Sequence, residues 1–270
     1  GRTVWKVEHA ARAAVLIDGA AFFAAVREAF LQARRTIFIV GWDIDSRTEL
    51  VGDRPPTDGF PTNLSAFLTE LTRRRPELQI HLLLWDYSLV YAHEREPLPR
   101  LSLNWQMPPQ VTFCLDSTVP FGSSQHQKLV VVDDALAFSG GLDLTIRRWD
   151  TSGHEPDNAR RVDPGGEPYR PFHDVQMMVD GEAGRALALL ARDRWCHANG
   201  GEPEVRPEGE PWPECFEPDF TDVGVAIART QPRYHREEEV REVEALFVES
   251  IARAERTIYI ENQFMTSGLV

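Results

Sequence analysis

The chain has 270 residues and a formal net charge of −13, from 42 acidic and 29 basic residues. This excess of acid disfavours broad binding to nucleic acid, which depends on cations that neutralise phosphates, so we expect no nucleic-acid partner. Three cysteines without a C-x-x-C pair disfavour a disulfide framework and a structural zinc site. No apolar run reaches the roughly 18 residues of a membrane span, and a cytoplasmic location, with room for membrane association, is expected.

The first two thirds of the chain alternate amphipathic helices with short apolar strands. This alternation indicates a layered α/β fold, and we expect an α-β-α sandwich whose mixed sheet is largely parallel. Asp18 is the expected cap of the first helix. The expected helices are 18–34, 63–74 and 182–199, and the expected strands are 36–44, 78–87, 110–116, 126–134, 135–141 and 174–181, with a tight turn at Asp133–Asp134.

Two segments lack any periodicity. Residues 200–219 are rich in Pro, Gly and Glu, which is typical of an exposed linker, and we extend this linker to residue 235. Residues 150–172 form a second long irregular segment. Loops of that length in a compact domain are often functional lids or rims.

An internal repeat relates the two ends of the chain. "AFLQARRTIFIVGWDIDS" (29–46) aligns without gaps to "SIARAERTIYIENQFMTS" (250–267), with six identical positions. Any two helix–strand units can look alike in this way. A duplicated domain is the other interpretation, and it divides the chain into a first domain (1–199), a linker (200–235) and the first helix and strand of an incomplete second copy (236–270).

The stretch "HQKLVVVDDALAFSGGLD" (126–143) carries the densest chemistry. In a strand, residues i and i+2 point to the same face, so His126 and Lys128 should project together. A lysine neutralises phosphate oxygens, while an imidazole can attack phosphorus or shuttle a proton near neutral pH. Paired glycines allow close backbone approach to a ligand. The full pattern is His126-x-Lys128-x4-Asp133-x6-Gly140-Gly141-x-Asp143.

This pattern resembles the signature of the phospholipase D superfamily, HxKxxxxD followed by a Gly-Gly or Gly-Ser turn and usually an Asn. Asp143 stands where the family usually has Asn. "YRPFHDVQMMVDGEA" (169–183) resembles the family segment that follows the first motif. "TIYIENQF" (257–264) resembles the strand that opens the second half, and "GWDIDS" (41–46) is similar to lipid-type members.

The resemblance implies a mechanism in which two motifs, one from each half, face each other. His126 is then the nucleophile that forms a phosphohistidine, Lys128 binds phosphate, and Asp133 anchors the strand turn. Asp174 matches the carboxylate that orients the histidine of the opposite half. Gly140, Gly141, Asp143 and Asn262 are expected on the substrate side, with no metal or other cofactor.

We therefore expect a phosphatidyl-transferring enzyme, a phospholipase D or a cardiolipin synthase-like transferase, acting on phospholipid at a membrane surface. A nuclease or other phosphodiesterase of the same family is the alternative, and a phosphate-binding scaffold without activity is a third. The second motif is expected in a missing half, truncated or cleaved, and a homodimer is disfavoured by the repeat. His173 and His154 are left outside the chemistry. Trp42, Trp85 and Trp149 fit buried packing better than an acyl groove.

Overall fold

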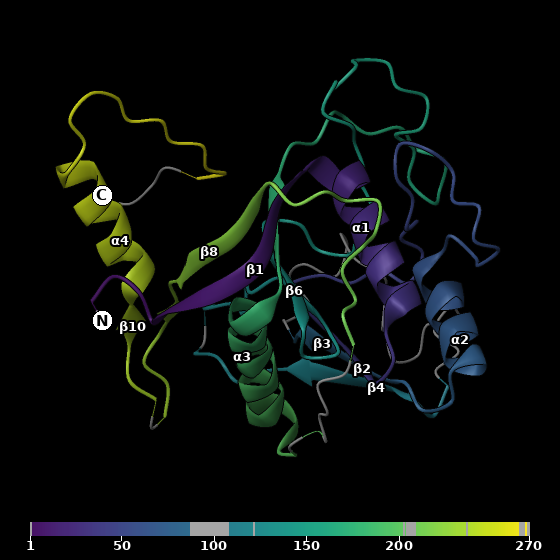
Figure 1. Cartoon of the computed structure of the whole chain (residues 1–270), viewed down its shortest axis with the longest axis horizontal. Coiled ribbons are helices and arrows are strands. Elements are labelled where there is room, and N and C mark those ends of the chain that lie inside the picture. Colours follow the sequence, from purple (N-terminus) through teal and green to yellow (C-terminus); the bar gives the residue numbers. More distant parts are fainter. Residues whose placement is uncertain are drawn as a thin grey trace.

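The computed structural model describes residues 2–86, 108–120, 122–201, 203, 209–235, 237–264 and 268. Their core is one eight-stranded sheet with the order β4-β3-β2-β5-β6-β7-β1-β8 (Figure 1). A small ribbon of β9 (Thr230–Gln231) and β10 (Val240–Arg241) lies apart from it. The eight strands are β1 (Lys6–Ile17), β2 (Thr36–Gly41), β3 (Gln79–Trp85), β4 (Val111–Asp116), β5 (Leu129–Val132), β6 (Leu136–Gly140), β7 (Val175–Val179) and β8 (Phe220–Ile227).

Helices cover both faces of the sheet, which confirms the predicted α-β-α sandwich (Figure 1). The helices α1 (Asp18–Gln32) and α2 (Leu64–Arg74) pack on one face, and α3 (Gly181–Asn199) packs on the other. All six residues of β2 are buried, as expected for a central strand covered on both sides. Asn63 caps α2 by accepting a hydrogen bond from the Ala66 N–H.

The sheet is mixed, as predicted, but the expectation that it is largely parallel is wrong. Only β2–β3 and β3–β4 pair in parallel, and the other five pairings are antiparallel. The reason lies partly in the β5–β6 connection, because a parallel pair needs a long crossover and this loop is three residues. Asp133 and Asp134 both adopt a φ of 52°, a left-handed conformation that aspartate tolerates better than most residues.

Two strands of the sheet were not expected from the sequence. β1 is rich in alanine, which has a low strand propensity, yet it pairs with β7 on one side and β8 on the other. β8 lies inside the predicted linker 200–235 and runs along β1 from Lys6 to Ala13. The predicted linker is therefore wrong over Phe220–Ile227, which belongs to the sheet.

The C-terminal segment agrees with the sequence only in part. The predicted helix is α4 (Glu242–Ala252), but residues 257–264 do not form the predicted strand. A strand needs a neighbour to pair its backbone groups, and no strand of the described residues pairs with this segment. Residues 265–267, which end the second repeat, lie outside the described residues.

Within the part of the chain that the structure describes, no helix combines the length and the apolar character needed to cross a membrane.

Candidate active site

The strand register gathers all of the motif residues except Asp133 at one edge of the sheet. Val40 pairs with Leu129, Gly140 with Gln176, and Ile17 with Val175. As a result β2, β6 and β1 end where β5 and β7 begin. We call this end of the strands the His126 edge. The side chains that lie there are Asp18, Trp42, His126, Lys128, Asp143 and Asp174.

His126 lies in the segment without regular secondary structure that precedes β5, so it is not part of the strand predicted for it. Its ring meets Trp42 edge-to-face at 6.1 Å between centroids, and Trp42 stacks on Trp85 at 5.8 Å. The residue is exposed, yet its surroundings remove enough water to lower the pKa of the ring, and the charge of Lys128 lowers it further. A neutral, accessible imidazole at pH 7 can act as a nucleophile.

Lys128 is held by a buried carboxylate. Its Nζ lies 2.9 Å from Asp143 Oδ2, and both side chains are less than a tenth exposed. Asp143 Oδ1 accepts a hydrogen bond of 2.9 Å from the backbone N–H of Trp42. Burial raises the pKa of Asp143, and Lys128 opposes that rise. The structure thus places Asp143 as the partner of Lys128, whereas the sequence placed it on the substrate side.

Gly140 and Gly141 lie so close to strand β7 and to Asp174 that neither position has room for a side chain. A Cβ atom at Gly140 would collide with Gln176, and one at Gly141 would collide with the carboxylate of Asp174. The sequence assigned these glycines to close approach of a ligand. In the structure they allow β7 to place Asp174 against the β6 end.

Asp174 lies at the same edge, immediately before β7. Its Oδ1 accepts a 2.8 Å hydrogen bond from the Val175 N–H, and its side chain is partly buried. Burial raises the pKa of Asp174, an effect that the Val175 hydrogen bond and then the Lys128 charge offset only in part. A carboxylate in this state can orient an imidazole and stabilise it when it becomes charged.

Asp133 occupies the opposite end of β5, away from the His126 edge. Its carboxylate is fully buried and accepts hydrogen bonds from the backbone N–H groups of Arg34 (2.7 Å), Arg35 (2.7 Å) and Thr36 (2.9 Å). It ties the turn after β5 to the start of β2. This geometry is that of an anchor, although the sequence pattern groups Asp133 with the catalytic residues.

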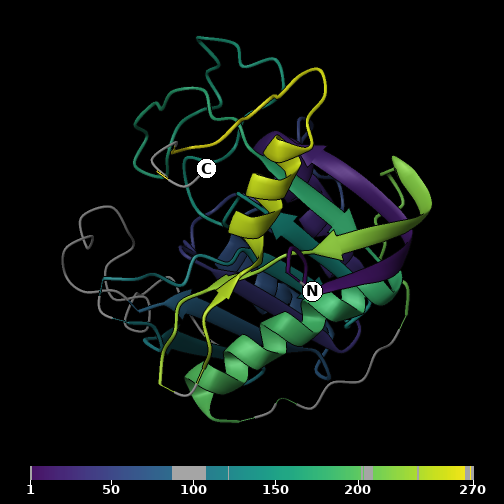
Figure 2. The same ribbon diagram turned by 90° about the vertical axis from the view of Figure 1, so that its left-hand side faces the viewer.

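The segment after α4 reaches the region of the His126 edge (Figure 2). Glu261 Oε1 lies 3.0 Å from His173 Nε2. Asn262, the neighbouring residue, is exposed, and its substrate role stays a prediction. Of the three tryptophans, Trp149 is buried in the core, while Trp42 and Trp85 remain partly exposed beside His126.

Sequence reasoning missed three polar residues here. Asp18 does not cap α1, because it has a φ of 68° and its buried Oδ1 lies 2.6 Å from His173 Nδ1. Strand alternation points His173 away from the site, but β7 begins only at Val175, so alternation does not govern residue 173. His154 contacts the same carboxylate group of Asp18. The "HD" pair of "FHDV" was the one available signal.

Comparison with known proteins gives consistent similarities. No protein-family model matches the chain. Phospholipase D C of Dictyostelium discoideum is 27% identical over 214 residues, covering 67% of this chain and 12% of that protein. Phospholipase D zeta 1 of Arabidopsis thaliana is 33% identical over 161 residues, 57% of this chain and 14% of that protein. Phospholipase D alpha 1 of Vigna unguiculata is 24% identical over 313 residues, 88% of this chain and 38% of that protein.

The chain thus spans 12% to 38% of the length of these three relatives. The similarities agree with the signature that runs from His126 to Gly141, of which His126, Lys128 and the two glycines lie at one sheet edge. The chain belongs to the phospholipase D superfamily.

Proposed function

We propose that this chain supplies one catalytic motif of a phosphodiesterase that acts on phospholipids, as a phospholipase D or as a cardiolipin synthase-like transferase. The observation that carries the proposal is the exposed ring of His126, whose pKa is lowered, beside the ammonium group of Lys128. The nucleophile and the phosphate-binding cation then stand at one edge of the sheet. The relatives, which bear the name phospholipase D, support the same substrate class.

In the proposed reaction, a ring nitrogen of His126 attacks the phosphorus of the diester. The new P–N bond forms as the P–O bond to the head-group oxygen breaks. A second imidazole gives its proton to the departing oxygen. Water, or an acceptor alcohol, then returns a proton to that imidazole and attacks phosphorus. The P–N bond breaks, which releases phosphatidic acid or a new diester and restores His126.

The second imidazole is proposed to come from another copy of the motif, because residues 1–270 contain a single His-x-Lys pair. A second half of the same protein, or less favourably a second copy of this chain, would supply it. Asp174 would orient that incoming ring, since its carboxylate stands free of ion pairs at the same edge as His126 among the described contacts. Lys128 would offset the charge that develops on the phosphate oxygens.

The test is turnover of phosphatidylcholine and phosphatidylglycerol vesicles by the full-length protein, with and without an acceptor alcohol. We expect His126→Ala to abolish release of the head group and to abolish capture of ³²P on the protein from labelled lipid. His9→Ala is the matched control, because His9 is a histidine at β1 that pairs with Asp222, outside the motif.

Cleavage of plasmid DNA without lipid turnover would move the protein to the nuclease alternative. Phosphate binding with no turnover of either substrate would leave the scaffold alternative. Full activity of His126→Ala would contradict the proposal.

A further inference from the structure

Three side chains that the proposed reaction does not use converge beside the His126 edge. They are Asp18 at the β1–α1 junction, His154 in the loop that follows Asp150, and His173 just before β7. Each offers one ligand atom, and these atoms all lie within 4.8 Å of one another. Two imidazoles and one carboxylate form a ligand set that transition metals bind in proteins.

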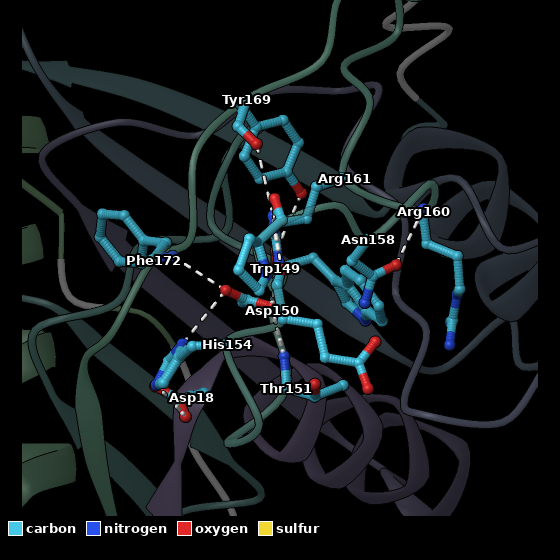
Figure 3. A network of polar contacts seen from close by, with 12 residues as sticks. Asp18, Trp149, Asp150, Thr151, His154, Asn158, Arg160, Arg161, Tyr169 and Phe172 are labelled. Carbon is cyan, nitrogen blue, oxygen red and sulfur yellow. Dashed lines mark hydrogen bonds and ion pairs between the residues drawn. The ribbon is translucent and has the colours of Figure 1, made fainter.

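Both histidines have a carboxylate on the ring nitrogen that faces away from the cluster. His154 Nδ1 lies 3.2 Å from Asp150 Oδ2, and His173 Nε2 lies 3.0 Å from Glu261 Oε1. Asp150 is itself fixed by Arg161 at 3.0 Å (Figure 3). An imidazole that ligates a metal usually donates its other N–H to such a carboxylate, which fixes the ring and raises its basicity.

Asp18 provides an independent observation. Its side chain is fully buried, and its Oδ2 has no hydrogen-bond partner among the described residues. That oxygen faces His154 Nε2 at 3.3 Å, and Figure 3 shows the His154 ring between Asp150 and Asp18. A buried carboxylate oxygen without a hydrogen bond is costly, and a bound cation removes that cost.

The spacing fits a small divalent ion. Zinc bonds of about 2.0–2.1 Å at tetrahedral angles hold ligand atoms about 3.3 Å apart. The distance between Asp18 Oδ2 and His154 Nε2 already has this value. The 2.6 Å contact between Asp18 Oδ1 and His173 Nδ1 is a hydrogen bond, and it would lengthen when a metal ion replaces its proton.

We propose that Asp18, His154 and His173 bind a divalent transition-metal ion, with Zn²⁺ as the best-fitting ion. The ion would join three parts of the chain: the start of α1, the loop 150–172 and the entry to β7. His173 adjoins Asp174, so the ion would hold the loop against the His126 edge. This is a positioning role that stands whether or not the protein turns over phospholipid.

The test is titration of Zn²⁺ into the metal-free, tag-free full-length protein by calorimetry, with metal content measured by mass spectrometry. We expect one Zn²⁺ per chain and a visible absorption spectrum when Co²⁺ is bound instead. His154→Gln and His173→Gln should each weaken binding by well over tenfold. His9→Gln, a control outside the cluster, and His126→Ala should leave the stoichiometry and affinity unchanged.

A variant that fails to fold would mimic loss of metal, so Glu261→Gln provides a milder test. Glu261 is exposed, and loss of an outer carboxylate typically weakens metal binding by about 10–100-fold without removing a ligand. Zn²⁺ should also raise the melting temperature of the wild type but not that of the folded His154→Gln variant. The proposal is overturned if Zn²⁺ does not bind, or if it binds equally well to both histidine variants, or if His126→Ala abolishes binding.

Discussion

Asp133 and Asp174 stand at opposite ends of the sheet and show how differently it uses two carboxylates. Asp133 is fully buried and accepts hydrogen bonds from three backbone N–H groups, so its carboxylate serves to hold the fold together. Within the part of the chain that the structure describes, Asp174 accepts from a single N–H, that of its neighbour Val175, and burial raises the pKa of Asp174. The same strand, β5, has a structural anchor at one end and the chemistry of His126 and Lys128 at the other. Nearness within a motif therefore does not mean nearness in the site.

The largest effect is expected from Asp133→Ala. One buried and two partly buried N–H groups would lose their acceptor, and the penalty is about 1–3 kcal/mol for a buried group, so the free energy of unfolding should fall by about 3 kcal/mol. Urea denaturation followed by circular dichroism measures it. Asp157→Ala, which changes an exposed aspartate, should stay within about 0.5 kcal/mol of wild type. A stable but inactive Asp133→Ala protein would contradict this contrast with Asp174, because Asp133 would then take part in the reaction.

His81, a residue of strand β3, makes the stability of the fold depend on pH. Its ring stacks on Phe38 at 4.5 Å and meets Trp195 at 4.9 Å, and burial lowers its pKa from 6.5 to about 4. Below pH 6.5 the unfolded chain therefore binds a proton that the folded chain excludes until about pH 4. The contribution of the neutral His81 ring to stability is therefore fully present above pH 6.5. Below that pH the free energy of unfolding falls, by at most about 3 kcal/mol.

Denaturation at pH 7.0, 5.5 and 4.5 measures this slope, and His81→Phe should flatten it while keeping the ring stack. The same variant also separates the pH dependence of activity at the His126 edge from the pH dependence of unfolding. The pKa of His126 is lowered as well, so the acidic limb of activity should fall below the ordinary histidine range. If activity in His81→Phe still falls at the same pH, that limb belongs to the site and not to unfolding.

A smaller effect, on activity alone, is expected from Asp174→Asn. The amide keeps the shape but cannot stabilise a charged imidazole, so kcat should drop about 100-fold, or about 2.7 kcal/mol of activation free energy. The free energy of unfolding should barely change, in contrast to Asp133→Ala. Steady-state vesicle assays and urea denaturation of the same preparation test both points. A large loss of stability with normal kcat in the folded fraction would reverse the assigned roles.

The smallest effect is expected from Asp143→Asn. An asparagine oxygen can still accept from the Trp42 N–H, but the negative charge that pairs with Lys128 is gone. Lys128 should then attract phosphate more strongly, which lowers KM about two- to fivefold (about 0.4–1 kcal/mol) with kcat unchanged. Asp143→Leu, which removes the acceptor as well, should lose activity. A higher KM in Asp143→Asn would show that the carboxylate itself is needed to position Lys128.

Much of the fold between residues 18 and 199 could be predicted from the sequence, because its helices and strands are long apolar patterns with clear periods. β1 could not, since its alanines favour a helix and only pairing on both sides makes it a strand. β8 follows a Pro- and Glu-rich stretch, and nothing local separates it from a linker.

The residues of the candidate site could likewise be predicted only in part from the sequence. His126, Lys128 and Asp133 share one short motif, so their relation could be predicted from spacing. Asp18 and His173 are 155 positions apart and meet only because β1 pairs with β7. No periodicity within either segment reports that contact. The pairing of Lys128 with Asp143 is likewise a property of the folded sheet edge.

The pairing of β8 with β1 bears on how this protein can be shortened. A chain cut after residue 199 would lose β8 and Asp219, whose Oδ2 accepts a hydrogen bond from the Val15 N–H. β1, twelve residues long, would then be an open edge strand, and open apolar edges invite strand addition and aggregation. Expression boundaries placed after Ile227 instead would keep that edge closed.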